Sequence, residues 1–348
     1  MSVMVGVGKG AQSGILIKNA EALETLHKVN VLITDKTGTL TEGKPSVDLI
    51  YSHKVGHEET LLAHVASLSQ HSEHPLSQAV VKYAKEHNVA LTKVDDFEAV
   101  AGKGVVGKKA DQHIAMGNNK LMAQLGIDIT DELRQKVESQ QKLGKTVSYI
   151  AVEQHALGFI AISDAIKDSS SDALSQLMAR GIEVIMMTGD NRNTAAAVAA
   201  DLGLESFEAE CLPQDKLNKV KELHALGKIV AMTGDGINDS PALAQADIGI
   251  AMGTGTDVAM ESAEITLVNG DLHGIIKAVQ LSEAVMRNIK QNLFFAFFYN
   301  ALGVPVAAGI LFPAFGILLS PMIAAVAMSF SSVSVISNSL RLRKLTLS

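Results

Sequence analysis

Seven consecutive residues decide the fold of this chain: Asp35-Lys36-Thr37-Gly38-Thr39-Leu40-Thr41. They follow the apolar, β-branched segment 29–34, which is typical of a buried parallel strand. Asp35 therefore lies at the carboxyl end of a strand, where open α/β sheets bind ligands. A carboxylate there can act as a nucleophile, and the lysine, hydroxyls and turn amides that follow can hold a phosphate. A lone Asp-Lys-Thr is more simply a strand-end aspartate that caps a turn, but the seven-residue run is much more specific.

Two further apolar segments are likewise followed by a polar motif that contains an aspartate. Residues 182–187 lead to Thr188-Gly189-Asp190, and residues 228–232 lead to Thr233-Gly234-Asp235, with Asp239 shortly after. The carboxyl ends of parallel strands meet at one edge of a sheet, so these distant motifs are expected to form a single site. The sequence thus predicts an α/β fold, although each strand-end aspartate taken singly is ambiguous.

Residues 43–159 interrupt this pattern as an insertion. They alternate helical stretches with short strand-like runs and end in two alternating segments, 146–152 and 157–162. The α/β pattern returns only after the insertion. We therefore expect a discontinuous domain made of residues 1–42 and 160–280, with an α+β domain inserted at 43–159.

Composition excludes several functional classes. The chain of 348 residues has a net charge of -7, which argues against nucleic acid as a partner. It contains 1 Cys, which excludes a disulfide framework and a cysteine-based zinc site. The hydrophobic content is 47%, and it is concentrated toward the end of the chain.

The final segment is predicted to be a two-helix transmembrane hairpin, residues 281–348. Its parts 292–312 and 316–340 are each long enough for a membrane span of about 20 residues. No Asp, Glu, Lys or Arg occurs between 291 and 340, while Lys and Arg flank both outer ends. This charge pattern predicts a multi-pass membrane protein in contact with lipid, with both ends and the soluble domains in the cytoplasm. A buried helical hairpin in a soluble core is the alternative.

The seven-residue run matches the phosphorylation motif of the P-type ATPases, and the whole chain resembles the heavy-metal members of that family. The resemblance implies a haloacid dehalogenase-like, Rossmannoid phosphorylation domain with a nucleotide-binding domain in the insertion. It implies that Asp35 attacks the γ-phosphate of ATP and becomes an aspartyl phosphate. It also implies that Lys216 neutralises phosphate charge, and that Thr188 and Asp190 bind phosphate and orient the site.

A Mg²⁺ ion is implied at the same site. Its expected ligands are the carboxylates of Asp35 and Asp235 and the backbone oxygen of Thr37, with Asp239 supporting the network. Hard carboxylate oxygens suit this ion.

The inserted domain carries the His-Pro pair that marks the heavy-metal subclass, and His74 is implied to contact adenine. The residues expected to bind the nucleotide are Glu73, His74, Gly102, Gly104, Gly117 and Asn118. Glycines let the backbone approach a ligand closely. Two positions depart from the family. Ser69 replaces a common Glu, so different purine contacts are expected, and Ala165 replaces a Pro after Asp164, which makes that hinge turn less rigid.

Polar residues within the apolar hairpin indicate the transported metal. Tyr299 and Asn300 lie in the first segment, and Met328 and Ser332, four residues apart, share one helix face in the second. A Met thioether is a soft ligand suited to Cu(I). The combination resembles the copper(I) subgroup, whereas a zinc pump would carry an Asp in the last span. Alternatively, Asn and Ser bond helix to helix and Met328 only packs.

The chain corresponds to only the second half of the family pattern. The Cys-Pro-Cys helix and the actuator domain precede this part in the family. We therefore expect a C-terminal fragment of an ATP-driven copper(I) exporter, whose missing N-terminal half is a partner that transport requires. Two other functions stay open: a membrane-bound nucleotide-binding partner of a separately encoded half, and a soluble haloacid dehalogenase-like phosphatase.

Overall fold

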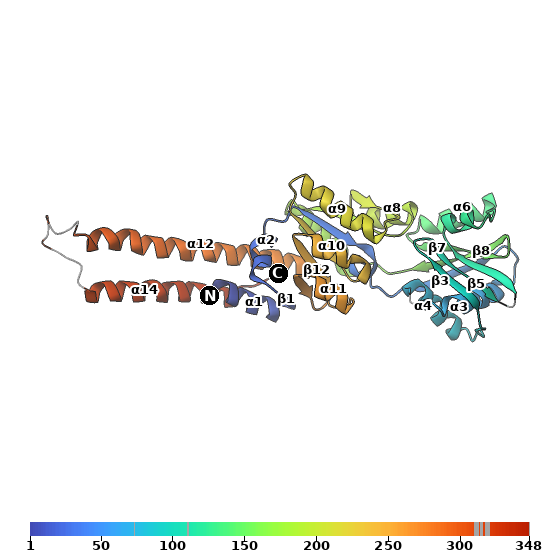
Figure 1. The fold of residues 1–348 in the computed structure, drawn as a ribbon, viewed down its shortest axis with the longest axis horizontal. Helices are drawn as coiled ribbons and strands as arrows, with labels where there is room; N and C mark the ends of the chain where they lie inside the picture. Colours follow the sequence, from blue (N-terminus) through green and yellow to red (C-terminus); the bar gives the residue numbers. More distant parts are fainter. Residues whose placement is uncertain (73, 110, 310–312, 314–315, 317–320, 348) are drawn as a thin grey trace.

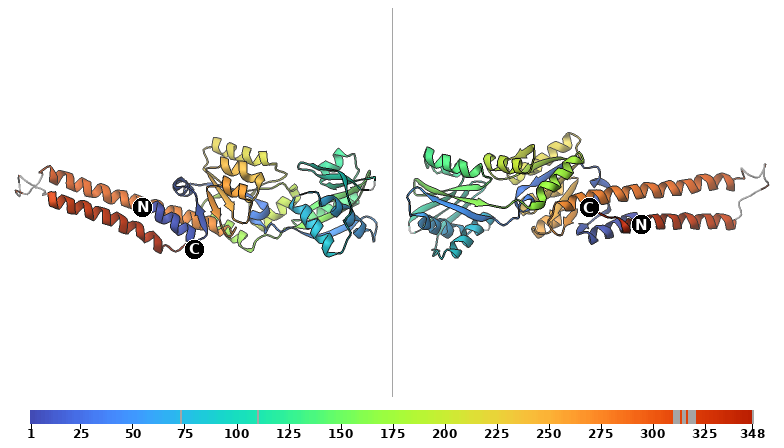
Figure 2. Two further views of the ribbon diagram at one scale, coloured as in Figure 1. Left: turned by 60° about the horizontal axis from the view of Figure 1, so that its bottom comes forward. Right: turned by 180° about the vertical axis from the view of Figure 1, so that it is seen from behind.

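The computed structural model describes residues 1–72, 74–109, 111–309, 313, 316 and 321–347, and for 307 and 321–328 it describes the backbone alone. The molecule is elongated. A helical hairpin, a large lobe and a small lobe follow one another along its length (Figure 1). Both chain ends lie where the hairpin meets the large lobe, and two further views show the same arrangement (Figure 2).

The large lobe is built on a sheet that has, among the described residues, the strand order β1-β13-β12-β11-β2-β9-β10. Its strands are β1 Ile15–Ile17, β2 Val31–Asp35, β9 Glu183–Met187, β10 Ser206–Glu208, β11 Val230–Gly234, β12 Ile248–Met252 and β13 Ile265–Leu267. Strand β1 pairs antiparallel with β13, and the other neighbours run parallel. Strand β2 is buried along its whole length, and its residues 31–33 are accordingly a continuous apolar run rather than an alternating one.

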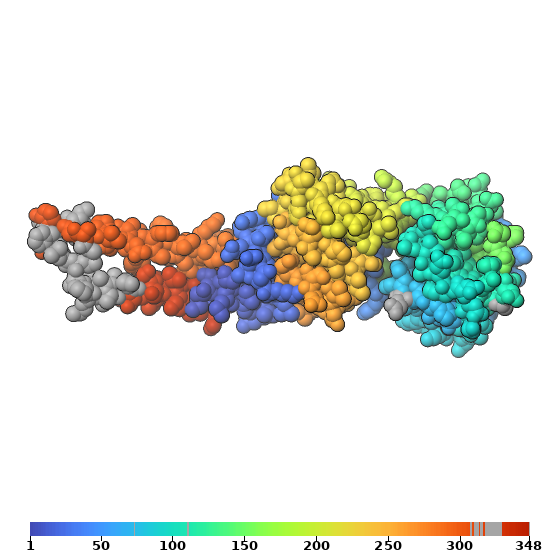
Figure 3. Space-filling view, viewed as in Figure 1, coloured from blue at the N-terminus to red at the C-terminus, as the bar shows by residue number. Residues whose placement is uncertain are grey.

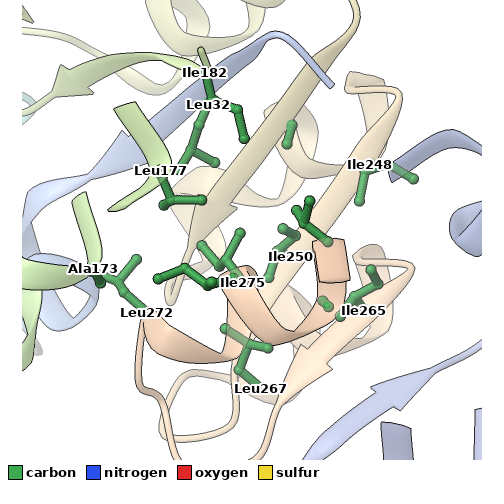
Figure 4. Packing of buried hydrophobic residues seen from close by; sticks show 14 of the residues in the cluster. Leu32, Ala173, Leu177, Ile182, Ile248, Ile250, Ile265, Leu267, Leu272 and Ile275 are labelled. Carbon is green, nitrogen blue, oxygen red and sulfur yellow. The ribbon is translucent and has the colours of Figure 1, made fainter. Parts of the chain in front are cut away.

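Helices cover both faces of the large sheet. They are α1 Ser2–Gln12, α2 Ala20–Leu26, α7 Asp168–Ala179, α8 Arg192–Asp201, α9 Pro213–Ala225, α10 Ser240–Gln245, α11 Asp257–Ser262 and the start of α12 His273–Ala307. Side chains alternate along β2. Leu32 packs in a core with α2, α7, α8 and α12 (Figure 4). Val31 and Ile33 pack in a second core with α9, α10 and α11.

The small lobe is an antiparallel sheet with the strand order β3-β8-β7-β6-β5-β4 among the described residues. Its elements are β3 Ser46–Ser52, β4 Asp95–Val100, β5 Gly104–Lys109, β6 Gln112–Gly117, β7 Thr146–Val152, β8 His155–Ser163, α3 Glu58–Ser69, α4 Pro75–Glu86, α5 Asn119–Gln124 and α6 Asp131–Gln141. One core joins the sheet to α3 and α4, and a second joins it to α5 and α6. The two lobes lie against each other with a notch between them (Figure 3).

Two adjacent stretches of chain connect the lobes. Thr41 pairs with Ile166, and the backbone N–H of Glu42 donates to the carbonyl of Ala165 at 2.8 Å. The carboxylate of Asp164 accepts from the Thr41 hydroxyl at 2.6 Å and from the Lys44 amide at 3.0 Å. Side-chain hydrogen bonds therefore hold this crossing together at a position where the sequence lacks the expected proline.

The hairpin consists of α12 and α14 Pro321–Leu340, which run antiparallel (Figure 1). Helix α12 begins well before the predicted segment because its first turns are part of the large-lobe core. Helix α14 is described from Pro321 onward, and Gly316, at the start of the second predicted segment, has a left-handed backbone with a φ of 67°. Within the described residues, none of the helices combines the length and apolarity of a membrane span.

Polar side chains tie the base of the hairpin to helix α1. The side-chain amide of Asn292 donates to the Ser2 hydroxyl at 2.9 Å and to the Ser339 hydroxyl at 3.0 Å. Asn338 donates to Asn292 at 2.9 Å, and Asn288 donates to the carbonyl of Asn338 at 2.8 Å. All five residues are buried, so this network fixes how the helices meet beside the large lobe.

Candidate active site

The three motif-bearing strands end level with one another. Thr34 of β2 is in register with Thr233 of β11 on one side and with Met186 of β9 on the other. Asp35 is the next residue of β2, and Thr188 and Asp235 directly follow the ends of β9 and β11, so all three lie at one edge of the sheet, as the sequence predicts. Helices and turns that begin at this edge complete the site.

The turn η1, Lys36–Leu40, requires glycine at one position. Gly38 has a φ of 70°, which is unfavourable for other residues. A Cβ atom at Gly38 would lie 1.7 Å from an oxygen of Asp235, so any side chain would displace that carboxylate. The glycine thus permits the close approach of the turn to the end of β11.

A cluster of carboxylates, formed by Asp35, Asp235 and Asp239, is the centre of the site. One oxygen from each lies within 4.8 Å of the others, and the described residues contain no other such group of His, Cys, Asp and Glu. The ammonium of Lys216 donates to Asp35 at 2.5 Å and to Asp239 at 2.7 Å. Lys216 comes from the first turn of α9, so the topology of the sheet brings three distant segments together.

Burial and mutual repulsion shift the pKa values of this cluster. Burial raises the pKa of Asp35 to about 6, because Lys216 opposes this effect only in part and Asp239 adds to it. Burial raises the pKa of Asp235 to about 7, with further repulsion from Asp35 and Asp239. Burial acts to lower the pKa of Lys216, yet the two carboxylates outweigh it and raise that pKa above its ordinary value. The cluster therefore has an excess of negative charge that a cation would relieve.

The donor set fits a magnesium ion. Carboxylate oxygens are hard ligands, and the pKa values of Asp35 and Asp235 are raised by burial and by mutual repulsion that the nearby lysines offset only in part. Asp35, Asp235 and Asp239 are the residues that would hold the ion. Thr37 follows in the turn η1, two residues from Asp35, as the predicted source of a backbone ligand.

A second charge pair lies beside the first. The ammonium of Lys36 is 2.5 Å from the carboxylate of Asp190, and both side chains are nearly buried. Asp190 also accepts hydrogen bonds from the hydroxyls of Thr146 at 2.7 Å and Thr188 at 3.2 Å. Burial acts to raise the pKa of Asp190, but Lys36 outweighs it and lowers that pKa below its ordinary value. The lysine next to the candidate nucleophile is thus paired with the Thr188-Gly189-Asp190 motif.

Glycines and an asparagine of the predicted nucleotide site lie together in the small lobe. Gly104 pairs with Gly117 across β5 and β6, and a Cβ at Gly117 would lie 2.3 Å from the carbonyl of Lys103. The Asn118 side chain caps α5 and donates to the carbonyl of Gly102 at 2.9 Å. These contacts give each residue a role in the fold, whether or not a nucleotide is bound.

His74 and its neighbours begin helix α4. The Nδ1 atom of His74 accepts a hydrogen bond from the Leu76 amide at 3.2 Å, which leaves Nε2 to carry the proton of a neutral ring. Glu73 lies outside the described residues. Ser69, where the family commonly has Glu, is buried, and its hydroxyl has no hydrogen-bond partner among the described residues.

The predicted copper ligands lie on the hairpin. Tyr299 and Asn300 are exposed on α12, and Ser332 is exposed on α14. Because Asn292 contacts Ser339 and the helices run antiparallel, Asn300 and Ser332 lie within about one helical turn of the same level. The side chain of Met328 lies outside the described residues.

Comparison with known proteins identifies the family. The model for haloacid dehalogenase-like hydrolases matches residues 29–247. The chain belongs to this family. This haloacid dehalogenase-like protein is 55% identical over 347 residues to a copper-exporting P-type ATPase of Legionella pneumophila, of which it covers 47%. It is 54% identical over 347 residues to a silver exporting P-type ATPase of Salmonella typhimurium, of which it covers 42%. Both matches include 100% of the chain.

Solved structures agree with these relatives. A zinc-transporting PIB-type ATPase in the E2.Pi state aligns with a TM-score of 0.71 and 34% identity, over 98% of this chain and 54% of that one. A catalytic domain of the CPx-ATPase CopB-B aligns with a TM-score of 0.63 and 29% identity, over 80% of this chain and 97% of that one. The predicted resemblance to heavy-metal P-type ATPases and the predicted haloacid dehalogenase-like fold are confirmed. The chain spans about half the length of the curated relatives it matches.

Lys167 is a residue of this haloacid dehalogenase-like site that the sequence reasoning did not identify. Its ammonium donates to the carbonyls of Gly38 and Thr39 at 2.9 Å each and to that of Gly270 at 2.8 Å. It therefore anchors the turn after Asp35 to the loop before α12. A single lysine has no sequence signal for such a role, although its position just after Asp164 places it at the crossing between the lobes.

Replacing Lys167 with Met is expected to destabilise the haloacid dehalogenase-like fold by about 2–4 kcal/mol. The change keeps most of the side-chain length but leaves carbonyls of the site turn without their donor. Urea unfolding of the full chain measures the difference. Lys221 is exposed on α9, so Lys221→Met is the matched control. It is expected to change the free energy of unfolding by no more than about 0.5 kcal/mol. Equal losses of unfolding free energy in the two variants would contradict the anchoring role of Lys167.

Proposed function

We propose that this chain is the catalytic and hairpin part of an ATP-driven copper(I) exporter that works through a phosphorylated Asp35. The observation that carries the proposal is the position of Lys216, which bridges Asp35 and Asp239 beside Asp235. The similarity to copper-exporting and silver exporting P-type ATPases supports it. Transport is proposed for the complete pump, since the chain matches about half of those relatives, and the unmatched half is its proposed partner.

The proposed reaction is transfer of the γ-phosphoryl group of ATP to Asp35. Lys216 holds Oδ1 of Asp35, so Oδ2 is the attacking atom. The new bond joins Oδ2 to the γ-phosphorus, the bond from that phosphorus to the β–γ bridging oxygen breaks, and ADP leaves. Asp35, Asp235, Asp239 and the backbone of Thr37 would hold a Mg²⁺ ion, which would supply charge neutralisation at the phosphate. Phosphoryl transfer depends mostly on such positioning and neutralisation.

The remaining parts of the site have proposed roles in binding and orientation. Thr188 and Asp190 bind and orient phosphate, with Asp190 paired to Lys36. The domain at 43–159 binds ATP through His74, Glu73, Gly102, Gly104, Gly117 and Asn118. The discontinuous domain at 1–42 and 160–280 carries phosphorylation. Ser69, where the family commonly has a carboxylate, is buried, so the purine contacts are expected to differ from those of the family.

We propose that the hairpin at 281–348 lies in a lipid bilayer with the two lobes in the cytoplasm. Large apolar side chains on its outer surface support this location. They include Leu293, Phe294, Phe297, Leu302 and Val304 of α12, and Phe330, Val333 and Ile336 of α14. Monomeric soluble proteins rarely expose such contiguous apolar surface. Copper(I) is proposed to contact Tyr299, Asn300, Met328 and Ser332 within the hairpin.

Labelling with ATP tests the proposed function. The purified full chain, incubated with γ-labelled ATP and Mg²⁺, is expected to retain label on acid gels. Hydroxylamine should remove the label, because an acyl phosphate is sensitive to it, and Asp35→Asn should show none. Absence of label in the wild-type chain, together with release of phosphate from small phosphoesters, would instead indicate a phosphatase.

A further inference from the structure

One of the surfaces along which the two lobes contact each other is short; we call it the lobe seam and define it as residues 141–146 of the small lobe and 188–194 of the large lobe. The Thr194 hydroxyl donates to the carbonyl of Lys145 at 2.7 Å. The Asn193 amide donates to Gln141 at 3.3 Å. The Thr146 hydroxyl donates to Asp190 at 2.7 Å. Of these contacts, the one made by Thr146 reaches a charged group of the candidate active site.

The carboxylate of Asp190 is shared between the lobes. Its Oδ1 accepts from Thr146, which begins β7 of the small lobe. Its Oδ2 contacts Lys36 at 2.5 Å and accepts from Thr188 at 3.2 Å, both in the large lobe. Lys36 is the immediate neighbour of Asp35 in the chain. A single carboxylate thus links the small lobe to the residue next to the candidate nucleophile.

Removing this hydroxyl has a specific consequence. Asp190 is nearly buried, so a lost donor is not simply replaced by bulk water. Hydrogen bonds to charged groups are stronger than neutral ones. When the lobes separate, Thr146 leaves with the small lobe, and the carboxylate keeps only its large-lobe partners. The orientation of Asp190, and with it the position of Lys36, then depends on whether the lobes are together.

We propose that Thr146 is a positioning residue for phosphoryl transfer. When the lobes close, its hydroxyl keeps the carboxylate of Asp190 paired with the ammonium of Lys36. Closure of the lobes is thereby coupled to the position of Lys36 beside Asp35. The proposal rests on the proposed function, since it concerns the same reaction. Thr146 acts through its hydrogen bond to Asp190. Its role is therefore distinct from nucleotide binding by the glycines and His74.

Thr146→Val is the test, because valine keeps the shape and the β-strand preference and removes only the hydroxyl. The initial rate of Asp35 labelling at saturating ATP is expected to fall about tenfold, which corresponds to one hydrogen bond to a charged group. The ATP concentration that gives half the maximal rate should change less than about twofold, since the nucleotide contacts are intact. Thr146→Ser keeps the hydroxyl and should restore most of the rate.

Asn193→Ala is the matched control at the same seam. It removes a contact between the lobes that does not involve Asp190, so the labelling rate should stay within about twofold of the wild-type rate. An equal loss of labelling rate in Asn193→Ala and Thr146→Val would show that the seam contributes only through packing, and would overturn the proposal. An unchanged rate in Thr146→Val would overturn it as well.

Hydrogen exchange separates failure of this inference from failure of the proposed function. In the full chain without nucleotide, Thr146→Val should increase deuterium uptake of the peptide spanning 188–191 by about twofold, while Thr146→Ser and Asn193→Ala leave it near the wild-type value. Unchanged uptake in Thr146→Val overturns the coupling even if Asp35 is labelled. Missing label in the wild-type chain rejects the proposed function, and the exchange result still decides whether Thr146 holds Asp190.

Discussion

Replacing Lys216 with Met is expected to lower the rate of Asp35 labelling by about 100-fold or more. The ammonium donates to Asp35 and Asp239, and no other cation contacts these two carboxylates among the described residues. Without it, the carboxylate cluster and the incoming phosphate carry unbalanced negative charge. Loss of one preorganised charge-stabilising donor in an enclosed site commonly costs this much. Initial rates of labelling with γ-labelled ATP measure the effect.

The control for this change lies one turn further along the same helix. Lys219 pairs with Glu208 and Glu222 near the surface, away from the carboxylate cluster. Lys219→Met should therefore label at a rate within about twofold of wild type, because surface ion pairs contribute little. Circular dichroism and thermal unfolding establish that both variants are folded. A folded Lys216→Met variant with a wild-type labelling rate would remove Lys216 from the proposed mechanism.

Replacing Asp235 with Asn is expected to abolish stabilisation by Mg²⁺ and to stabilise the metal-free chain at neutral pH. The pKa of Asp235 is raised to about 7 by burial and by repulsion from Asp35 and Asp239. In the metal-free chain, the folded state therefore keeps a proton that the unfolded chain releases near its ordinary pKa of 3.8. The unfolded state binds fewer protons over this range, so the free energy of unfolding falls as pH rises from about 4 to about 7.

Mg²⁺ reverses this trend because it competes with the proton for the same oxygens. The rise in melting temperature caused by millimolar Mg²⁺ should be larger at about pH 8 than at about pH 5.5. The Asp235→Asn variant should have the same melting temperature with and without Mg²⁺ at both pH values. Asp201→Asn, an exposed change at the end of α8, should retain the full Mg²⁺ response. A Mg²⁺ response that is independent of pH, or one that survives in Asp235→Asn, would place the ion elsewhere.

The central part of the fold could be predicted from local patterns in the sequence. A continuous apolar run before Asp35 indicated a buried parallel strand, and two similar runs before Thr188 and Asp235 indicated neighbours in one sheet. Parallel strands present their carboxyl ends at one edge, so the convergence of these residues followed from topology alone. The haloacid dehalogenase-like family is confirmed by the match over residues 29–247.

The ends of the hairpin helices were less predictable. Apolar composition indicated two helices but not that α12 begins at His273, because its first turns use the same apolar residues to complete the core of the large lobe. Helix α14 is described from Pro321 onward, and Gly316, at the start of the second predicted segment, adopts a left-handed backbone.

The sequence by itself determined which residues carry the candidate chemistry, because Asp35, Thr188 and Asp235 belong to motifs that local pattern and strand topology bring together. Only the tertiary structure decided their partners. Lys216 reaches Asp35 across 181 positions of sequence, and Lys167 reaches Gly38 across 129. The resemblance to a known family had already assigned Lys216 to phosphate charge, but its bridge between Asp35 and Asp239 and the role of Lys167 have no local sequence pattern. The direction of a side chain is set by the packing of the helix or turn that carries it, and this packing exists only once the sheet has formed.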